Sequence, residues 1–450
     1  MKTGLVFFPA FDWAISPTHP EREERLLYTR DQLFEEGIMD LPQIVEYQPR
    51  MASDKDIART HFCVPGVKDQ ATDAHRISCG GALTIADAVM QGEVKNGFAL
   101  VRPPGHHAMR VAHGNRGFCN INNEAIMVDY LRKVYGLKKI AIVDTDVHHG
   151  DGTQEIFWHD PDVLFISFHQ DGRTLYPGSG FTDEIGGPLA MGYTLNVPLP
   201  PSTTDVGILH VIDELVKPVL QDFKPDLVVN SAGQDNHFTD PLANMRFSAR
   251  GYAELNKRLA PDIAVLEGGY SVETALPYVN TGIIMAMAGI DYGSLYEPEY
   301  DPKMFQESPQ RMDTLKKIIE ELQTVWQRRE RLIEAARGKW EKFYQRHKPI
   351  YYDTDGIHEE QTETLRMCPS CAGYMTIDSQ AFGRRGQDHR IMGISIPVNG
   401  CRNCQNDARE LYDGLKKKGG DRFDFVYLQD KANNDLLRYT IRTGQEIRFE

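Results

Sequence analysis

The feature that most constrains the fold is a series of short, mainly apolar runs that alternate with stretches of helical pattern. The apolar runs have the length of strands and lie at residues 4–8, 98–101, 139–144, 163–167, 226–230 and 262–267. The helical patterns between them include residues 123–132, 205–221 and 248–259. Strands that are apolar throughout are buried on both faces, which is typical of a parallel sheet covered by helices. The chain is therefore predicted to have an α/β fold whose ligands gather at the carboxyl ends of the strands.

The organisation of the chain changes near residue 292. Beyond a linker at 296–302 that contains Tyr and Pro, apolar residues recur on one helical face, namely Ile318, Leu322, Val325, Leu332, Ala336, Trp340 and Phe343. This spacing predicts an amphipathic helix with charged residues on its other face. We therefore expect three parts: a large domain at 1–292, a helical connector at 303–348 and a small accessory domain at 349–450.

The accessory domain carries four of the seven cysteines, as the pairs Cys368-Pro-Ser-Cys371 and Cys401-Arg-Asn-Cys404. Two Cys-x-x-Cys pairs separated by such a linker are typical of one structural zinc ion held by four thiolates. The alternatives are a redox dithiol and two unrelated turns, but two spaced pairs fit one metal ion better than one dithiol. The segment is thus predicted to be zinc-ribbon-like. Its role is open: it can recruit a protein partner, support a homo-oligomer or cover the rim of a site in the large domain.

The formal net charge of −14 argues against direct nucleic-acid binding, which needs a basic surface. A basic substrate suits such a protein better. The longest later apolar stretch, near residues 282–290, is too short to cross a bilayer, and the first apolar run lacks the cleavage pattern of a signal peptide. Because the cysteine pairs favour a metal over disulfides, we expect a cytoplasmic protein without membrane contact.

Residues suited to metal binding directly follow two of the predicted strands. The run at 139–144 leads into Asp144-Thr-Asp-Val-His-His-Gly-Asp-Gly152, and the run at 226–230 leads into Ser231-Ala-Gly-Gln-Asp235. Asp146 and His148 are two positions apart, so in extended backbone their side chains share one face and can bind one metal ion. Asp235 can bring a third ligand to the same edge. Two Asp and one His leave a zinc ion an open position for water, which is typical of a catalytic site.

Each of these residues also has a plainer interpretation. A single Asp at a strand end is more often a turn former or helix cap, and a single His is more often structural. Four acidic or His residues within six positions, after a buried strand, are hard to explain in that way.

A second cluster, Arg102-Pro-Pro-Gly-His-His-Ala108, follows the run at 98–101. Pro104 and Gly105 allow the backbone to turn, so that both His side chains can face the site and pair with carboxylates there. Taken by itself, this cluster also fits a surface turn or a metal-binding His pair.

Together these motifs resemble the histone deacetylase family, which includes bacterial deacetylase-like amidohydrolases and acetylpolyamine amidohydrolases. The resemblance is carried, in the family's order and spacing, by residues 102–108, Gly117-Phe-Cys-Asn120, residues 144–152, Tyr176-Pro-Gly178, Asp235 and Leu266-Glu-Gly-Gly-Tyr270. His19-Pro20-Glu21 with Arg25 is similar to the family's N-terminal motif. The resemblance spans about residues 1–290 and implies the arginase/deacetylase fold, a parallel sheet flanked by helices.

The resemblance implies a role for each matching residue. Asp146, His148 and Asp235 match the ligands of the family's catalytic zinc ion. The residues that match its catalytic groups are Tyr270, whose hydroxyl polarises the scissile carbonyl, and the tandem pair His106 and His107 with their partners Asp144 and Asp151. Gly117, Phe118 and Tyr176 match the walls of the acyl-lysine tunnel, and we add Leu242 as a substrate-binding residue. A structural potassium ion is also implied, held by the region of Asp144, Asp146, His148, Ser167 and Phe168.

The implied activity is zinc-dependent hydrolysis of the amide of an acylated lysine side chain or a similar acylated amine. Zinc lowers the pKa of bound water toward about 7, and His107, held by Asp151, moves the proton to the leaving amine. An acetylpolyamine amidohydrolase is an alternative. Polyamine-specific relatives carry an acidic residue shortly after the last zinc ligand, whereas in this chain Asp240-Pro241 is followed by Leu242, which weakens this alternative. A non-catalytic acyl-lysine binding protein is a further alternative, and it would need neither Tyr270 nor the His pair.

Arginases share this fold but bind two manganese ions. The positions of their second-metal ligands hold Gly150 and His237 in this chain. The sequence therefore argues against an arginase.

Overall fold

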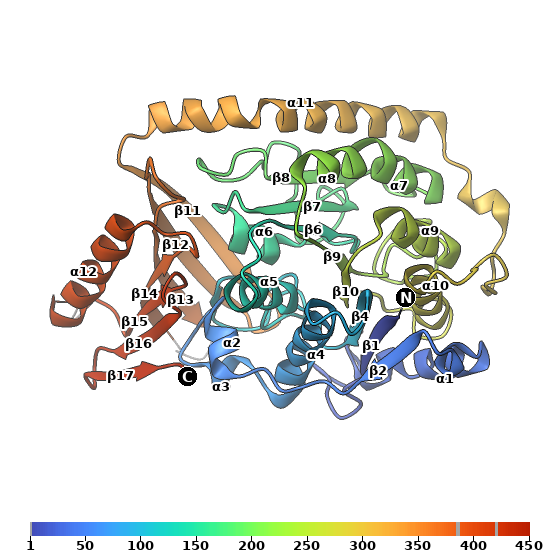
Figure 1. Ribbon diagram of the computed structural model, residues 1–450, viewed down its shortest axis with the longest axis horizontal. Coiled ribbons are helices and arrows are strands. Elements are labelled where there is room, and N and C mark those ends of the chain that lie inside the picture. The colour runs from blue at the N-terminus through green and yellow to red at the C-terminus, as the bar shows by residue number, and fades with distance from the viewer. Residues whose placement is uncertain (1, 384–387, 419–421) are drawn as a thin grey trace.

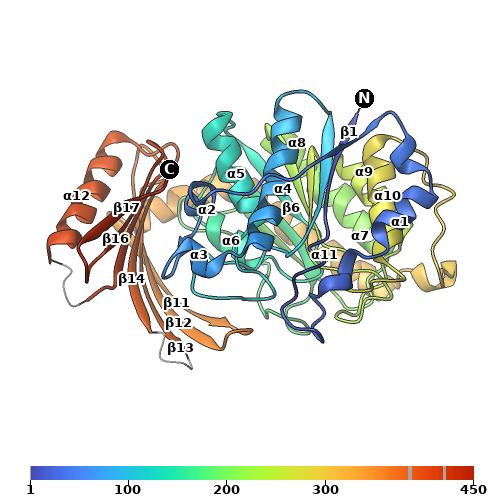
Figure 2. The same cartoon turned by 90° about the horizontal axis from the view of Figure 1, so that it is seen from below.

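The computed structural model describes residues 2–383, 388–418 and 422–450. In these residues two β-sheets lie side by side, and one long helix runs along both of them (Figure 1). The first sheet has helices on both faces, whereas the second is curved and carries one helix on its outer face (Figure 2). The chain builds the first sheet before the long helix and the second sheet after it.

Within the described residues, the first sheet has eight strands, all parallel. In spatial order they are β2 (Ile44–Tyr47), β1 (Thr3–Phe8), β4 (Asn96–Val101), β10 (Ile263–Leu266), β9 (Leu227–Ala232), β6 (Ile140–Asp144), β7 (Val163–Gln170) and β8 (Thr194–Leu199). All six predicted strands form, because each apolar run is buried. The predicted α/β fold with a parallel sheet is confirmed; β2 and β8 were not predicted.

Helices cover both faces of this sheet because its side chains alternate between two cores. Along β6, Ala141 and Val143 pack into one core, and Ile140 and Ile142 into the other. The helices of the first core are α1 (Thr29–Glu35), α7 (Asp205–Val211), α8 (Lys217–Phe223), α9 (Ala249–Leu259) and α10 (Leu276–Ala288). Those of the second are α2 (Asp54–Ala58), α3 (Val67–Gln70), α4 (Asp73–Met90), α5 (Asn123–Val134) and α6 (Asp151–Phe157). The helix predicted at 205–221 is observed as α7, a π-helical turn and α8.

The long helix α11 (Pro309–Lys339) lies across the top of the molecule in Figure 1. Its buried residues Leu315, Ile319, Leu322 and Trp326 follow helical spacing and join the first core. The helix ends before two residues of the predicted stripe: Trp340 caps it, and Phe343 begins a strand. In the described part of the chain, no helix combines the length and the apolar character needed to span a bilayer.

The second sheet has seven strands in chain order, as far as the structure describes it. They are β11 (Phe343–Tyr352), β12 (Ile357–Arg366), β13 (Met375–Gly383), β14 (His389–Ile396), β15 (Phe425–Asp430), β16 (Asp435–Thr440) and β17 (Gln445–Arg448). Neighbours are antiparallel except β14 and β15, which are parallel and are joined through α12 (Arg402–Lys418). The cysteine pairs thus belong to a sheet that begins at Phe343 and is more extensive than a zinc ribbon alone.

The second sheet packs directly against the first part of the chain. Two residues of β15 contact that part: the Tyr427 hydroxyl donates to the Cys63 carbonyl at 2.6 Å and the Gln429 side chain to the Ala58 carbonyl at 2.9 Å. These contacts lie beside the short pair of parallel strands β3 (Phe62–Cys63) and β5 (Val111–Ala112). Apolar residues of both parts form one shared core there, including Phe62, Val111, Leu365, Ile377 and Tyr427.

Candidate active site

Four neighbouring strands at the centre of the first sheet, β4, β10, β9 and β6, end at the same edge. Because the strands are parallel, the loops that follow them lie together although they are far apart in the sequence. The residues that these loops carry are His106 and His107 after β4, Tyr270 after β10, Asp235 after β9, and Asp146 and His148 after β6. The structure therefore gathers the predicted site residues at one edge of the sheet.

Asp146, His148 and Asp235 form a compact cluster whose ligand atoms all lie within 4.8 Å of one another. Nδ1 of His148 lies 3.2 Å from Oδ1 of Asp146 and 3.1 Å from Oδ2 of Asp235. Backbone N–H groups hold both carboxylates: Val147 donates to Asp235 at 2.9 Å and Gly268 donates to Asp146 at 2.7 Å. A Cβ at Gly268 would collide with the Asp235 carboxylate, so the close approach depends on glycine.

The charges in this cluster suit a bound cation. Burial opposes a charge on His148, but its hydrogen bonds to Asp146 and Asp235 outweigh burial and raise its pKa to about 10. Burial and then the charge of Asp146 raise the pKa of Asp235. Two buried carboxylates this close repel each other when both are ionised, and a cation between them removes that cost. Two carboxylates and one imidazole are a ligand set that Zn²⁺ accepts.

The tandem His residues each face a carboxylate. Nδ1 of His106 lies 3.1 Å from Asp144, and Nδ1 of His107 lies 2.8 Å from Asp151. Burial opposes a charge on His106, but Asp146 and Asp144 outweigh it and raise its pKa to about 10. Burial and then the neighbouring His106 lower the pKa of His107 to about 3. His107 is therefore neutral at pH 7, and because its Nδ1 donates to Asp151, its Nε2 is the atom that can accept a proton.

Arg116 completes the second of these pairs. Its guanidinium contacts both oxygens of Asp151, at 2.8 Å and 2.6 Å. Burial opposes ionisation of Asp151, but Arg116 and then the bond to His107 lower its pKa. The sequence did not reveal this role of Arg116, because no local pattern connects positions 116 and 151. Asp151 is thus held as a carboxylate that orients His107.

Tyr270 is buried with its ring against two other side chains. The Phe118 ring lies 5.5 Å away between centroids, and the Arg25 guanidinium lies 4.9 Å from the Tyr270 centroid. Burial raises the pKa of the Tyr270 hydroxyl, so it stays protonated and can donate. Asp240 accepts hydrogen bonds from the backbone N–H of Tyr270 at 2.7 Å and of Leu242 at 2.9 Å. Asp240 therefore fixes both residues at the site.

A pocket of about 290 Å³ lies over these groups. The residues that line it are Pro104, His106, His107, Gly117, Phe118, His148, Leu175, Tyr176, Leu242, Tyr270 and Asp353. All four predicted substrate-binding residues are among them. A Cβ at Gly117, whose φ is +53°, would collide with the His107 ring, so glycine is required there.

The pocket wall includes one residue of the second sheet, Asp353, which lies in the turn between β11 and β12. Its Oδ1 accepts hydrogen bonds from the backbone N–H of Gly117 at 2.9 Å and from the Tyr176 hydroxyl at 3.1 Å. Asp353 falls in the predicted accessory domain and was not predicted as a site residue. No sequence signal connects it to Gly117, because the contact depends on how the second sheet docks.

Of the residues named for potassium, Asp144 ends β6, Asp146 and His148 follow it in the loop, and Ser167 and Phe168 lie on the neighbouring strand β7. Ser167 is paired with Asp144 across these strands, and the Ser167 hydroxyl lies 2.8 Å from Nδ1 of His169. Phe168, the next residue on β7, is fully buried. The structure thus places these residues beside the Asp146 cluster.

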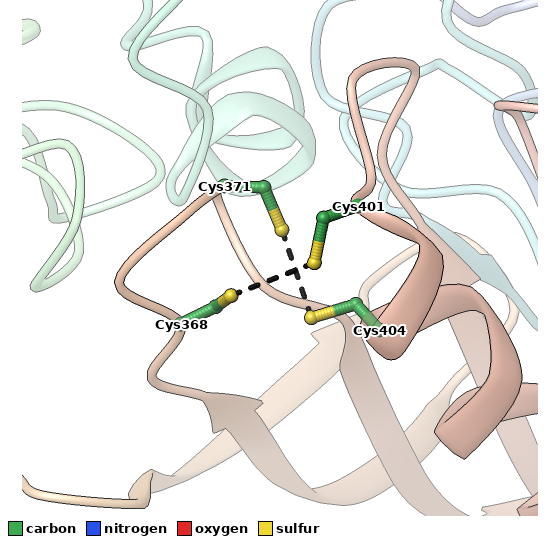
Figure 3. Close-up of side chains that lie close together, drawn as sticks. All are labelled: Cys368, Cys371, Cys401 and Cys404. Carbon is green, nitrogen blue, oxygen red and sulfur yellow. Dashed lines mark hydrogen bonds between the residues drawn. The ribbon is translucent and has the colours of Figure 1, made fainter.

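The second cluster of possible metal ligands consists of Cys368, Cys371, Cys401 and Cys404. Their sulfur atoms point toward a common centre, with Cys368 3.8 Å from Cys401 and Cys371 3.6 Å from Cys404 (Figure 3). The first pair follows β12, and the second pair stands at the start of α12. The predicted convergence of the two Cys-x-x-Cys pairs is therefore observed.

Known proteins share the features of the first part of the chain. Residues 65–286 match the family model described as the histone deacetylase domain. The chain is 46% identical to a probable deacetylase of Archaeoglobus fulgidus, in an alignment that covers 72% of this chain and 98% of that protein. It is 33% identical to the acetoin utilization protein AcuC of Staphylococcus aureus, over 66% of this chain and 84% of that protein.

The fold comparison agrees with the sequence comparison. The crystal structure of the HDA15 HD domain aligns with a TM-score of 0.62 and 27% sequence identity, over 75% of this chain and 98% of that domain. Because the archaeal relative and this domain are both covered almost completely, part of the present chain has no counterpart in either. The chain belongs to the histone deacetylase family and is a hydrolase of the deacetylase type.

Proposed function

We propose that the protein is a zinc-dependent hydrolase that removes an acetyl or related acyl group from a lysine side chain. The observation that carries the proposal is the position of His148. It belongs to the Asp146–His148–Asp235 cluster and also lines the pocket, beside His106, His107 and Tyr270. An acyl amide bound in the pocket would therefore lie next to the possible metal ligands, to the proton acceptor His107 and to the hydroxyl donor Tyr270.

When bound by this cluster, Zn²⁺ supplies a Lewis acid that activates water and polarises a carbonyl. Nε2 of His107 accepts the proton of the attacking water and delivers it to the nitrogen of the leaving amine as the C–N bond breaks. The Tyr270 hydroxyl donates a hydrogen bond to the carbonyl oxygen as negative charge develops there. His106, which is hydrogen-bonded to Asp144, tunes the charge and orientation of the groups around that oxygen. The products are a carboxylate and a free amine.

The shape and lining of the pocket support an acylated lysine as the substrate. Phe118, Tyr176, Leu175 and Leu242 give it apolar walls that suit a four-carbon chain. An acetylpolyamine is the second candidate, because the carboxylate of Asp353 at the wall can attract a further amine. Leu242 argues for the first candidate, since its apolar side chain offers no partner for a cation.

We further propose that Cys368, Cys371, Cys401 and Cys404 hold a structural zinc ion. Four thiolates close a tetrahedral coordination sphere and leave no position for chemistry. All seven cysteines are free, as expected in a reducing compartment such as the cytoplasm. A potassium ion at the Asp144 and Ser167 region of β6 and β7 completes the proposed ion content.

The test is a comparison of metal-free and zinc-loaded protein on two substrates. The full chain is stripped with a chelator and reloaded with zinc, and acetate release is measured from an Nε-acetyl-lysine peptide and from an acetylated polyamine. We expect activity to disappear with the metal, to return with zinc, and to favour the lysine substrate. A preference for the polyamine would support the second candidate, and full activity without metal would contradict the proposal.

A further inference from the structure

A second, larger cavity of about 790 Å³ lies between the first part of the chain and the second sheet. We call it the lateral cavity. It is lined by residues of the 113–115 segment, by the β11–β12 turn and by the ends of β13 and β14. Its volume is well above that of the acyl pocket, and cavities of this size bind ligands of several hundred daltons.

The lateral cavity and the acyl pocket share the same two chain segments. Asn115 lines the cavity and Gly117 lines the pocket; likewise Asp355 lines the cavity and Asp353 lines the pocket. Hydrogen bonds join these segments in register, from Asn115 N–H to Asp355 at 2.6 Å and from Gly117 N–H to Asp353 at 2.9 Å. The two cavities are therefore lined by the same pair of segments, at positions two residues apart on each segment.

The two segments are held firmly by buried contacts. Nε2 of His113 lies 2.9 Å from the Ser379 hydroxyl and 3.6 Å from the Glu359 carboxylate. The Tyr352 hydroxyl lies 2.7 Å from both the Val111 carbonyl and Glu359. The shared wall is thus preformed, so a ligand does not have to order it on binding.

The wall presents acceptor groups that remain free. Asp353 and Asp355 each use one carboxylate oxygen in the bonds described, and their other oxygens accept no hydrogen bond from the described residues. Among the described lining residues the carboxylates are Asp69 and Asp355, and none is Lys or Arg. Groups of this kind bind N–H donors and positive charge.

We propose that the lateral cavity binds the polypeptide that flanks the acylated lysine, with Asp353 and Asp355 accepting hydrogen bonds from its main chain or from a basic side chain. This inference rests on the proposed function and adds a specificity site to it. A peptide fits better than a small amine for two reasons. The cavity exceeds the space that a short amine needs, and its amide and imidazole groups can serve the carbonyls that every peptide unit also carries.

The test compares kcat/KM for a single-residue substrate, blocked Nε-acetyl-lysine, and for a heptapeptide with acetyl-lysine at its centre and basic residues beside it. Asp355→Asn keeps an oxygen for the Asn115 N–H but removes the charge. Thr354→Trp, at an exposed turn position, fills the cavity mouth. Glu360→Gln is the matched control, because Glu360 is an exposed acid on β12 outside both cavities.

We expect the wild-type protein to favour the heptapeptide by about tenfold or more, which corresponds to one additional charged hydrogen bond. Asp355→Asn and Thr354→Trp should reduce this ratio several-fold through KM, while Glu360→Gln leaves it unchanged. Melting temperatures check that each variant is folded. Equal ratios in Asp355→Asn and Glu360→Gln would overturn the proposal.

Binding measured without turnover separates this inference from the proposed function. Fluorescence anisotropy with a labelled heptapeptide, on zinc-loaded full chain carrying Tyr270→Phe, reads affinity alone. Weaker binding in Asp355→Asn supports the lateral cavity even if no substrate is hydrolysed. Equal binding in Asp355→Asn and Glu360→Gln contradicts it even if hydrolysis is observed.

Discussion

The two clusters of possible metal ligands are built in opposite ways. Asp146, His148 and Asp235 come from neighbouring strand ends, and backbone N–H groups hold both carboxylates before any metal binds. The four cysteines come from the loop after β12 and from the start of α12, and the sulfurs of Cys368 and Cys371 accept bonds of 3.4 Å and 3.3 Å from nearby backbone N–H groups. The first cluster is arranged by the ends of buried strands, whereas the second is built on a loop and a helix start that we expect a metal ion to stabilise.

The two clusters also differ in what lies next to them. The first forms the floor of a pocket, and the second lies beyond the end of β12 that is remote from the β11–β12 turn. Ten residues of strand span roughly 30 Å, so the cysteines are well separated from Asp353. We therefore expect changes at the first cluster to affect chemistry and changes at the second to affect stability.

The largest effect is expected for Asp235→Ala. It removes one of three ligands and leaves Asp146 and His148 without a complete site. Hydrolysis of acetyl-lysine should fall to background, because no side chain can replace the activation that the metal supplies. Circular dichroism should show a fold close to that of the wild type. Retained turnover would contradict the catalytic role assigned to the first cluster.

The next largest effect is expected for Tyr270→Phe. It keeps the ring between Phe118 and Arg25 but removes the hydroxyl. Loss of one donor to a developing oxyanion lowers kcat by about 10² to 10³-fold, with little change in KM. Steady-state kinetics measure both constants. A change confined to KM would assign Tyr270 to substrate binding instead.

A smaller effect is expected for Arg116→Gln, which removes a charge next to Asp151 and His107. Burial dominates the low pKa of His107, followed by His106, and Arg116 contributes to it; Arg116 also lowers the pKa of Asp151. Both pKa values should rise in the variant, so the acidic limb of kcat/KM moves to higher pH. At neutral pH we expect a loss of about tenfold, because the general base is less well oriented.

Arg116→Gln should also lower the stability of the fold at neutral pH. A carboxyl group whose pKa is lower in the folded state than in the unfolded state stabilises the fold at pH values above its unfolded pKa. This stabilisation is lost as the pH falls through the pKa of the folded state. The wild type should therefore be more stable than the variant at neutral pH, and the difference should shrink in acid. An acidic limb that stays in place or moves to lower pH would refute the role given to Arg116.

The smallest effect on chemistry is expected for Cys401→Ser combined with Cys404→Ser. Four thiolates can contribute about 10 to 16 kcal/mol of zinc-binding free energy at neutral pH, so the loops and α12 should loosen. Limited proteolysis should cut the second sheet faster than in the wild type, while turnover of blocked acetyl-lysine changes little. Unchanged protease resistance would show that the second sheet does not depend on this metal.

The sequence predicted the parts of the molecule that depend on local pattern. The apolar runs that became β6 and β9 are followed at once by Asp146 and Asp235, and parallel strands bring such positions together whatever the loop lengths. The tandem His residues were located in the same way, by their place after β4. The two Cys-x-x-Cys pairs were recognisable because ligand spacing within each pair is local.

The rest could not be read from the sequence, because it depends on contacts between distant segments. Arg116 meets Asp151 only through the folded loop, and Asp353 meets Gly117 only because the second sheet docks on the first part of the chain. Phe343 continued the helical spacing of α11 but begins β11, where cross-strand pairing with Arg366 outweighs local pattern. The predicted division at residue 349 accordingly falls inside β11, and the three-part domain organisation stays a proposal.

Zinc content and turnover measured on the same samples test the central claim most directly, namely that one zinc ion performs chemistry and the other supports the fold. The samples are the wild type, Asp235→Ala and the double cysteine variant. We predict two zinc ions per chain in the wild type and one in each variant, with turnover of blocked acetyl-lysine lost only in Asp235→Ala. If the cysteine variant keeps its remaining zinc but loses this turnover, the cysteine cluster takes part in the chemistry and the claim is wrong.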